Sequence, residues 1–274
     1  MRANELVRTI SNSLACVSDC PDFESKCLVS HFLNIELKDI YLGNKIGNPD
    51  LSEIDRAVKK RKENYPLQYI IGKWEFMGYE FLLNENVLIP RPETELLCEC
   101  LLDKIDKENV VYDICAGTGC IGISIALLTN AKVFCFEKYD GAFEILNKNI
   151  AFNNANNVSA IKWDILNKPD FEIPKADFIF SNPPYIESAL VPTLQKEVLK
   201  EPLTALDGGE DGLFFYRAIY ENFSSLLKPG GYLAFEIGEG QQKEIIDIFS
   251  SFSHIRTIKD YNSIERVVVF RKDI

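Results

Sequence analysis

The chain has 274 residues, of which 46% are hydrophobic and 26% are charged. This length accommodates about two domains and a sizeable core, and the composition excludes a wholly disordered, collagen-like or coiled-coil protein. No uninterrupted apolar run reaches the roughly 18 residues that a transmembrane helix needs, so we expect no membrane partner.

The net charge of −11 is distributed unevenly along the chain. Residues 1–88 contain 11 Lys and Arg against 13 Asp and Glu, whereas residues 89–274 contain 19 against 28. A nucleic-acid surface needs clustered Lys and Arg. The second part is therefore a poor surface for such a partner, and we expect no direct nucleic-acid binding.

The eight cysteines do not form a recognisable framework. No Cys-x-x-Cys pair occurs and the chain has two histidines, so the spacing gives little support for a zinc site, and we expect no metal. The N-terminal residues lack the apolar stretch of a secretory signal. We expect free thiols and a cytoplasmic location.

Residues 1–65 have the pattern of short helices. The first buries Leu6, Val7, Ile10 and Leu14 on one face, and a second begins near Pro21 and buries Cys27, Leu28, His31 and Phe32. A third carries Ile54 and Val58, and we expect its basic run at residues 59–62 to lie on a solvated face.

Residues 69–89 are rich in aromatic and β-branched residues, with turn signals at Gly72 and Gly78, and predict a β-hairpin linker. The stiff Pro90-Arg91-Pro92 then begins a second domain. The predicted divisions are a helical domain at 1–68, the hairpin linker at 69–89 and a second domain at 90–274.

In the second domain, strands and helices alternate, which predicts an α/β fold with a doubly wound, mostly parallel sheet. The predicted strands are 110–114, 133–136, 159–163, 177–180, 232–237, 254–258 and 266–270. The predicted helices are 121–128, 142–152 and 214–227, the last ended by Pro229-Gly230-Gly231. Ligands bind such sheets at the carboxyl ends of the strands.

A glycine-rich turn, Asp113-Ile-Cys-Ala-Gly-Thr-Gly119, joins the first of these strands to the next helix. Glycines allow a tight turn and a close approach of a ligand to the backbone. Glu137 ends the following strand, where an acid can accept the hydroxyls of a ribose. The pattern indicates an adenosine-type ligand and leaves open both a dinucleotide and an adenosyl-methionine compound.

A second motif, Asn182-Pro183-Pro184-Tyr185, follows the strand 177–180. Two consecutive prolines remove two N–H donors, so the carbonyl oxygens near Asn182 lack competing donors. Such acceptors suit a planar –NH2 group, with the Tyr185 ring packed against its plane.

Together with further segments, these motifs resemble class I S-adenosylmethionine-dependent methyltransferases, and in particular the HemK/PrmC family of protein-(glutamine-N5) methyltransferases. The matching segments are Pro66–Gly72, Ile89–Glu95, Asp113–Gly119, Asn182–Tyr185, Glu201-Pro202, Ala205–Gly209, Lys228–Gly231, Glu236–Gly238 and Asp260 to Val268. The resemblance implies a seven-stranded sheet and methyl transfer from S-adenosyl-L-methionine, with S-adenosyl-L-homocysteine as product. The acceptor would be the glutamine of the GGQ motif in peptide chain release factors, and residues 1–68 would recognise that substrate.

The resemblance also implies residue roles. The cofactor would be held by Cys115, Ala116, Gly117, Thr118, Gly119, Glu137, Asp164, Ile165 and Asn182. The glutamine would be held by Asn182, Pro183, Pro184 and Tyr185, of which Asn182, Pro183 and Tyr185 would be catalytic. The segment Pro90–Pro92 would help close the site. Because Cys115 stands where the family has glycine, we expect its φ to be negative.

Three other functions remain open from the residues alone. They are an adenine or cytosine amino-methyltransferase acting on DNA or RNA, a nicotinamide-dependent oxidoreductase, and a nucleoside-binding module without catalysis. The acids Glu197, Glu201, Asp207, Glu210 and Asp211 would form a solvated loop or attract a basic protein. Arg91 would either pair with Glu93 or Glu95 or act in the site.

Overall fold

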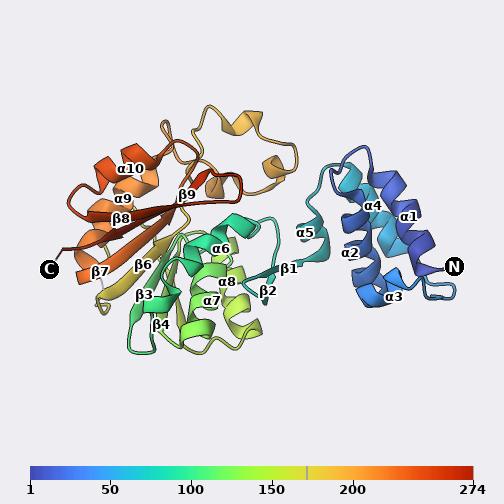
Figure 1. Cartoon of the computed structure of the whole chain (residues 1–274), viewed down its shortest axis with the longest axis horizontal. Coiled ribbons are helices and arrows are strands. Elements are labelled where there is room, and N and C mark those ends of the chain that lie inside the picture. Colours follow the sequence, from blue (N-terminus) through green and yellow to red (C-terminus); the bar gives the residue numbers. More distant parts are fainter. Residues whose placement is uncertain (171, 274) are drawn as a thin grey trace. The chain divides into compact units, whose positions relative to one another are not determined.

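The computed structural model describes residues 1–170 and 172–273. The chain divides into two compact units. Figure 1 shows the chain coloured by residue number. Unit 1 comprises Met1–Gly72 and Gln195–Lys200, and unit 2 comprises Lys73–Leu194 and Glu201–Ile274. Within the described ranges, no helix is long and apolar enough to cross a membrane.

Unit 1 is a small helical bundle built from α1 (Ala3–Leu14), α2 (Pro21–Leu33), α3 (Leu37–Tyr41), α4 (Ser52–Lys62) and α5 (Leu67–Ile71). The predicted apolar face of α1 is buried, including Leu6 and Leu14. On α2, however, the prediction was wrong in part, because Leu28 is buried but His31 is exposed. The buried side of α2 also contains Glu24, Ser25 and Val29.

A buried ion pair lies on this side of α2. Glu24 accepts hydrogen bonds from Arg61 of α4 at 2.8 and 2.9 Å. Arg61 also pairs with Glu197, at 2.8 Å, which holds the segment Gln195–Lys200 in unit 1. The expectation that the whole basic run of α4 is solvated was therefore wrong for Arg61, whose side chain is 3% exposed.

Unit 2 begins with the predicted hairpin, which is shorter than expected. Its strands are β1 (Lys73–Phe76) and β2 (Tyr79–Leu82), and the preceding residues belong to α5. Phe76 pairs with Tyr79, so a two-residue turn joins the strands. Met77 and Gly78 both have positive φ, as that turn requires.

The main sheet has seven strands in the order β5-β4-β3-β6-β7-β9-β8. Pairing is parallel from β5 to β7, and β9 is antiparallel to both of its neighbours. This confirms the predicted mostly parallel sheet. The strands are β3 (Val110–Ile114), β4 (Lys132–Glu137), β5 (Val158–Lys162), β6 (Ala176–Ser181), β7 (Leu227–Glu236), β8 (Ser253–Lys259) and β9 (Glu265–Arg271).

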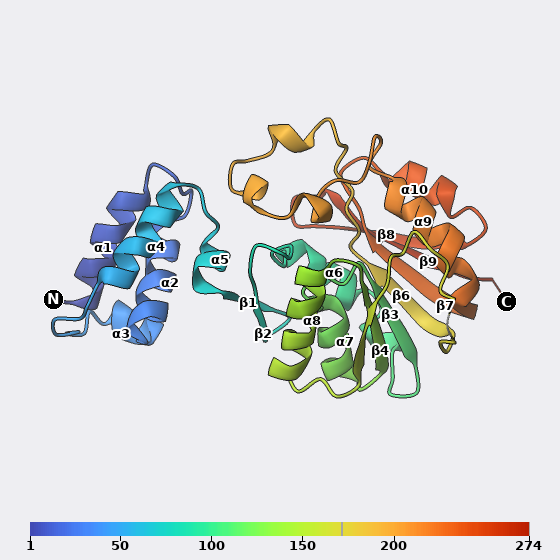
Figure 2. The ribbon, with the colours of Figure 1, turned by 180° about the vertical axis from the view of Figure 1, so that it is seen from behind.

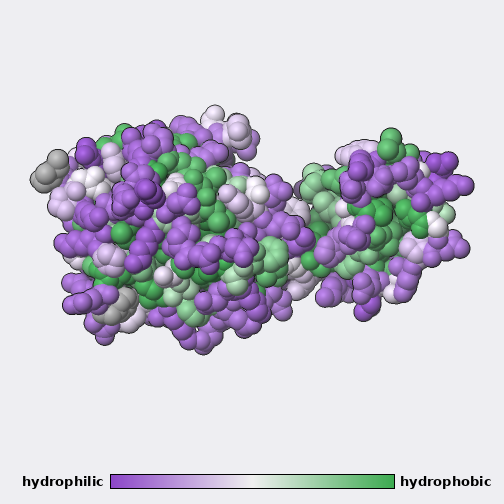
Figure 3. All heavy atoms as spheres, turned by 90° about the horizontal axis from the view of Figure 1, so that it is seen from below, coloured by the Kyte–Doolittle hydropathy of each residue, from purple (hydrophilic) through white to green (hydrophobic). Residues whose placement is uncertain are grey.

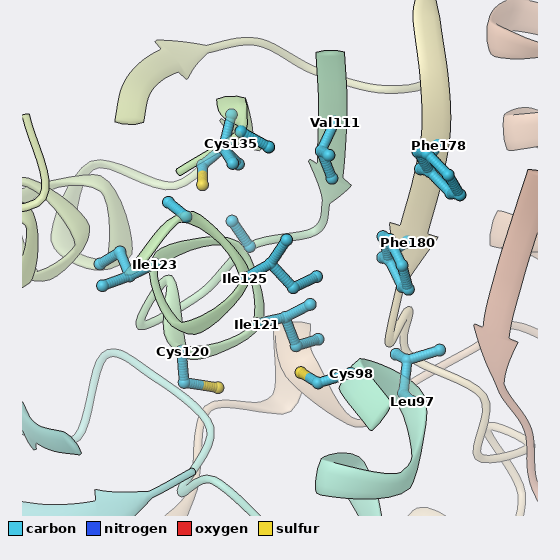
Figure 4. Packing of buried hydrophobic residues seen from close by; sticks show 14 of the residues in the cluster. Leu97, Cys98, Val111, Cys120, Ile121, Ile123, Ile125, Cys135, Phe178 and Phe180 are labelled. Carbon is cyan, nitrogen blue, oxygen red and sulfur yellow. The ribbon is translucent and has the colours of Figure 1, made fainter. Parts of the chain in front are cut away.

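Helices cover both faces of this sheet (Figures 1 and 2). The first face packs against α6 (Pro92–Glu99), α7 (Cys120–Thr129) and α8 (Asp140–Phe152). Figure 4 shows Ile121 and Ile125 of α7 and Leu97 of α6 gathered beside Val111, Phe178 and Phe180 of the strands. The second face packs against α9 (Phe214–Phe223) and α10 (Gln242–Ile248). Hydrophilic residues predominate on the face drawn in Figure 3.

Short 3-10 turns occupy Leu102–Lys104, Val191–Thr193, Val198–Lys200, Leu203–Ala205 and Ser224–Leu226. The last of these corrects the predicted helix 214–227, because α9 ends at Phe223 and β7 begins at Leu227. Pro229 thus lies inside a strand. The register between β6 and β7 is irregular there, between Ala176 and Phe178, and a bulge is where a strand tolerates proline.

Candidate functional site

A pocket lies in unit 2 at the carboxyl ends of the parallel strands. Its empty volume, including the part open to solvent, is about 900 Å³. Segments that follow β3, β4, β5 and β6 contribute to its wall, as the fold predicts. The lining includes the predicted site residues Cys115, Ala116, Gly117, Thr118, Glu137, Asp164, Ile165, Asn182 and Pro184. In the described part of the chain, Gly119, Pro183 and Tyr185 are not among the lining residues.

The turn after β3 has a left-handed backbone at alternate positions. Gly117 and Gly119 have φ of 54° and 80°, and Cys115 has φ of 62°. The expectation of a negative φ at Cys115 was therefore wrong. The Ala116 N–H donates to the Phe136 carbonyl at 3.0 Å, so the chain must turn immediately after β3 to reach β4. That turn sets the backbone of Cys115 despite its Cβ.

The glycines in this segment meet different needs. A Cβ at Gly119 would lie 2.4 Å from Leu146 Cδ1, and a Cβ at Gly122 would lie 2.5 Å from Cys135 Sγ. These two glycines permit α7 to pack closely on its neighbours. A Cβ at Gly117 would meet no atom of the described residues within 4 Å. Because Gly117 lines the pocket, this open space leaves room for a ligand against its backbone.

Glu137 supports the turn as well as facing the pocket. Its carboxylate accepts hydrogen bonds from the Gly117 N–H at 2.9 Å and from the Tyr139 N–H at 2.8 Å. Burial raises the pKa of this carboxyl, while the backbone donors oppose the shift. Each carboxylate oxygen can accept more than one hydrogen bond, so capacity remains for hydroxyl groups in the pocket.

Behind the turn, Asp113 is fully buried. Its Oδ2 accepts from the Gly122 N–H at 2.9 Å, whereas its Oδ1 has no hydrogen-bond partner in the described part of the chain. Burial raises the pKa of Asp113 to about 7, and the nearby Glu137 adds to the effect.

The next wall follows β5. Asp164 pairs with Lys138 at 3.0 Å and accepts from the Leu166 N–H. The Ile165 carbonyl accepts from Asn222 of α9. Apolar surface from Phe136, Ile165 and Phe215 completes this part of the pocket, which therefore suits a flat, weakly polar ring.

The Asn182–Tyr185 motif divides into two parts. Asn182 lines the pocket, and its Nδ2 donates to Thr94 Oγ1 at 3.3 Å. The Thr94 hydroxyl in turn donates to Glu236 Oε2 at 2.5 Å. Thr94 has one hydroxyl proton, so it must accept from Asn182, and the Asn182 Oδ1 is left for another partner.

Tyr185 is held within the protein, against the second apolar cluster. Its hydroxyl donates to Glu236 Oε1 at 3.3 Å, and its carbonyl accepts from Gln241 at 2.9 Å. Three glycines of the matching segments and their surroundings approach it closely. A Cβ at Gly208 would lie 2.7 Å from Tyr185 Cα, and one at Gly212 would lie 2.4 Å from its carbonyl oxygen. The third, Gly238, faces the Tyr185 ring.

The segment Pro90–Pro92 contributes Pro90 and Arg91 to the pocket. Arg91 pairs with Glu201, not with Glu93 or Glu95 as one reading of the sequence proposed. Glu201 also accepts from the Ile89 N–H at 3.1 Å and is buried. The expectation of a solvated acidic loop was thus wrong for Glu201. Asp211 is exposed, as that expectation has it, and pairs with the equally exposed Arg217.

Thr94 and Glu236 lie within the matching segments Ile89–Glu95 and Glu236–Gly238, but no role was predicted for either of them. Each is 2% exposed, and each contacts the Asn182–Tyr185 motif. Their partners are far away in the sequence, so only the folded structure brings the contacts together. The signal that could have found them is a polar residue within a segment that otherwise reads as buried.

Comparisons with known proteins cover nearly the whole chain. Residues 92–210 match the family described as Methyltransferase small domain, and residues 5–72 match the PrmC N-terminal domain. The chain is 40% identical over 224 residues to the release factor glutamine methyltransferase of Clostridium botulinum, covering 79% of each. It is 36% identical over 260 residues to the protein of that name from Thermodesulfovibrio yellowstonii, covering 91% of this chain and 92% of the relative.

Solved structures share the fold at lower sequence identity. A methyltransferase from Pyrococcus furiosus aligns with a TM-score of 0.56 and 20% identity, over 81% of this chain and all of that one. The tRNA m1G37 methyltransferase of M. jannaschii aligns with a TM-score of 0.51 and 16% identity, over 74% of this chain and 56% of that one. These structures support the architecture of the sheet and leave the substrate to other observations.

Proposed function

The chain belongs to the release factor glutamine methyltransferase family, and from this premise we propose that it methylates a glutamine side-chain nitrogen in peptide chain release factors. The methyl donor of this family is S-adenosyl-L-methionine. We propose that the reaction takes place in the cytoplasm, with the release factor as protein partner and without direct binding of nucleic acid.

The observation that carries the proposal is the orientation of Asn182. Its Nδ2 is used by Thr94, so its Oδ1 is the atom available in the pocket. A side-chain carbonyl that lacks an internal donor is a suitable acceptor for one N–H of a primary carboxamide. The Pro183 carbonyl, on a residue without an N–H of its own, is the second acceptor that we assign to the substrate amide.

The residues of the pocket fit the donor. Open space at Gly117 admits a ligand against the backbone, and Glu137 places a carboxylate where ribose hydroxyls can donate to it. Phe136, Ile165 and Phe215 provide apolar surface for an adenine ring. When bound, S-adenosyl-L-methionine supplies an activated methyl group on sulfur. We assign Cys115–Gly119, Glu137, Asp164, Ile165 and Asn182 to its binding.

The task left to the protein is mainly to position the nucleophile. An amide nitrogen is weakly nucleophilic, because its lone pair is delocalised into the carbonyl group. Hydrogen bonds to Asn182 Oδ1 and the Pro183 carbonyl would hold the nitrogen in one orientation and stabilise the positive charge that develops on it. The amide proton can leave after methyl transfer, so no general base is needed before that step.

Tyr185 has a different proposed role from the one its sequence position suggested. Its hydroxyl is engaged by Glu236 and its backbone is enclosed by glycines, so we propose that it fixes the main chain of the motif. This is how it would act on the substrate amide, through the position of Asn182 and Pro183.

The test is methyl transfer from tritiated S-adenosyl-L-methionine to purified release factor, with double-stranded DNA as a parallel acceptor. We expect label in the release factor alone. A release factor whose GGQ glutamine is replaced by glutamate has no –NH2 acceptor and should remain unlabelled. Equal labelling of that variant, or transfer to DNA instead, would contradict the proposal.

A further inference from the structure

Asn182 is the end of a buried hydrogen-bond chain that runs through Thr94 to Glu236. Asn182 Nδ2 donates to Thr94 Oγ1 at 3.3 Å, and Thr94 Oγ1 donates to Glu236 Oε2 at 2.5 Å. The three residues come from different elements: Asn182 follows β6, Thr94 lies in α6 and Glu236 ends β7. Thr94 and Glu236 are both 2% exposed, so water does not compete for these contacts.

Each hydrogen bond from Asn182 through Thr94 is donated in the direction of Glu236. An ionised carboxylate can only accept, which commits the Thr94 proton to Glu236 and commits the Thr94 lone pair to Asn182. The opposite amide orientation would set Asn182 Oδ1 against an oxygen that has no proton to give. These hydrogen bonds therefore select one of the two orientations of the Asn182 amide.

The charge environment of Glu236 includes groups from several elements. Burial raises the pKa of Glu236 and Glu93 adds to this, whereas the hydrogen bonds donated by Thr94 and Tyr185 and the charge of Arg266 favour its ionised form. Bonds that donate in sequence towards a charge polarise one another in a buried setting. Negative charge at Glu236 thus makes Asn182 Oδ1 a stronger acceptor at the other end.

Stability alone does not account for a buried acid at this position. A buried carboxylate is costly to desolvate, and well-packed apolar side chains in place of buried ionic groups are often neutral or stabilising. Thr94 joins this acid to the pocket, because its hydroxyl bridges Glu236 and Asn182.

We propose that Thr94 and Glu236 are positioning residues for methyl transfer: they fix the Asn182 carboxamide with Oδ1 towards the substrate amide and strengthen it as an acceptor. This inference rests on the proposed function for its rate effects. Among the described residues, Thr94 lines the pocket and Glu236 does not, and the role assigned to both positions acts through Asn182.

The main test compares Thr94→Val, Thr94→Ser and Glu236→Gln with the wild type in saturating assays with release factor. We expect Thr94→Val to lower kcat about tenfold, as for loss of one oriented hydrogen bond, with the calorimetric Kd of S-adenosyl-L-methionine changed less than twofold. Thr94→Ser retains the hydroxyl and should stay within about threefold of the wild type. Glu236→Gln keeps an acceptor but loses the charge, so its kcat should lie between these values.

A double variant separates positioning from a structural effect. In an Asn182→Ala background, Thr94→Val should lower kcat no further, since Thr94 then has no side-chain amide at position 182 to orient. Thr129→Val is the matched control, because its hydroxyl bonds Ile125 at the far end of α7 and the substitution should leave kcat unchanged. A further loss in the double variant, or full kcat in Thr94→Val, would overturn the inference.

A spectroscopic measurement distinguishes failure of this inference from failure of the proposed function. The side-chain NH2 signals of Asn182 can be identified by their absence from the spectrum of Asn182→Ala. They should shift in Thr94→Val and return towards their wild-type positions in Thr94→Ser, whatever the substrate is. Unshifted signals would refute the chain of contacts, whereas an inactive wild type would refute only the assignment of the substrate.

Discussion

Asp113 makes the stability of unit 2 depend on pH in a defined direction. Its carboxyl is fully buried; Oδ2 accepts from the Gly122 N–H and from the Cys135 thiol, and Oδ1 has no partner among the described residues. Burial raises its pKa from 3.8 to about 7 in the folded protein. The folded state therefore holds the proton more tightly than the unfolded chain does. This contribution to stability is fully present below pH 4 and is lost as the pH rises through 7.

The magnitude follows from the two pKa values. Each pH unit between them is worth about 1.4 kcal/mol, so ionised Asp113 lowers the free energy of unfolding by roughly 4 kcal/mol above pH 8. Between pH 5 and pH 8 the same relation gives a loss of roughly 2–3 kcal/mol. Asn at position 113 keeps an oxygen for the Gly122 N–H and cannot ionise, so Asp113→Asn should not show this loss.

Urea unfolding of the protein without cofactor, at pH 5, 6, 7 and 8, tests the reasoning. The free energy of unfolding of Asp113→Asn minus that of the wild type should increase by roughly 2–3 kcal/mol over this range. All other titrating groups are common to the two proteins, so the difference reports on Asp113. Parallel pH curves would refute the reasoning, as would a variant that becomes relatively less stable at high pH.

Other substitutions test the site and its packing. Asn182→Ala should lower kcat about 100-fold or more while the affinity for S-adenosyl-L-methionine falls less, and a near-normal steady-state rate would contradict its role. Glu137→Ala should raise the cofactor Kd about tenfold in calorimetry, with Glu137→Gln as the variant of matched shape; unchanged binding would count against the ribose contact. Gly122→Ala should lower the free energy of unfolding by about 1–3 kcal/mol in urea, because its Cβ would meet Cys135 Sγ at 2.5 Å, and adding Cys135→Ala should recover part of that loss.

The sheet could be predicted because its central strands, such as β3, β4 and β6, are short apolar runs that are buried on both faces. Val110–Ile114 was predicted with the bounds it has in the structure, and the other strands differ by a few residues at most for the same reason. The exception is β7, which starts five residues before the predicted strand. Pro229 and two glycines resemble a helix end, and only pairing with β6 shows that a bulge accommodates them.

The sequence predicts which residues belong to the candidate site better than it predicts which partners their side chains contact. The turn after β3 and the acid at Glu137 carry local signals, since both follow from how a strand joins a helix. Charged residues carry no such signal. Glu201 has the same acidic character as its solvated neighbours, and its burial depends on Arg91, 110 positions earlier. Arg61 was likewise hidden within a basic run until Glu24 and Glu197 were placed beside it.

Cys115 shows how the fold can override a local preference. A side chain at positive φ costs roughly 1–2 kcal/mol compared with glycine, which is why a negative φ was the sound expectation. The Ala116 N–H, however, must reach the Phe136 carbonyl, and the glycines at 117 and 119 continue the same turn. The hydrogen bond and the packed sheet around it outweigh the strain at one residue. Cys115 also lines the pocket, so the residue with the strained backbone is one that can contact a ligand.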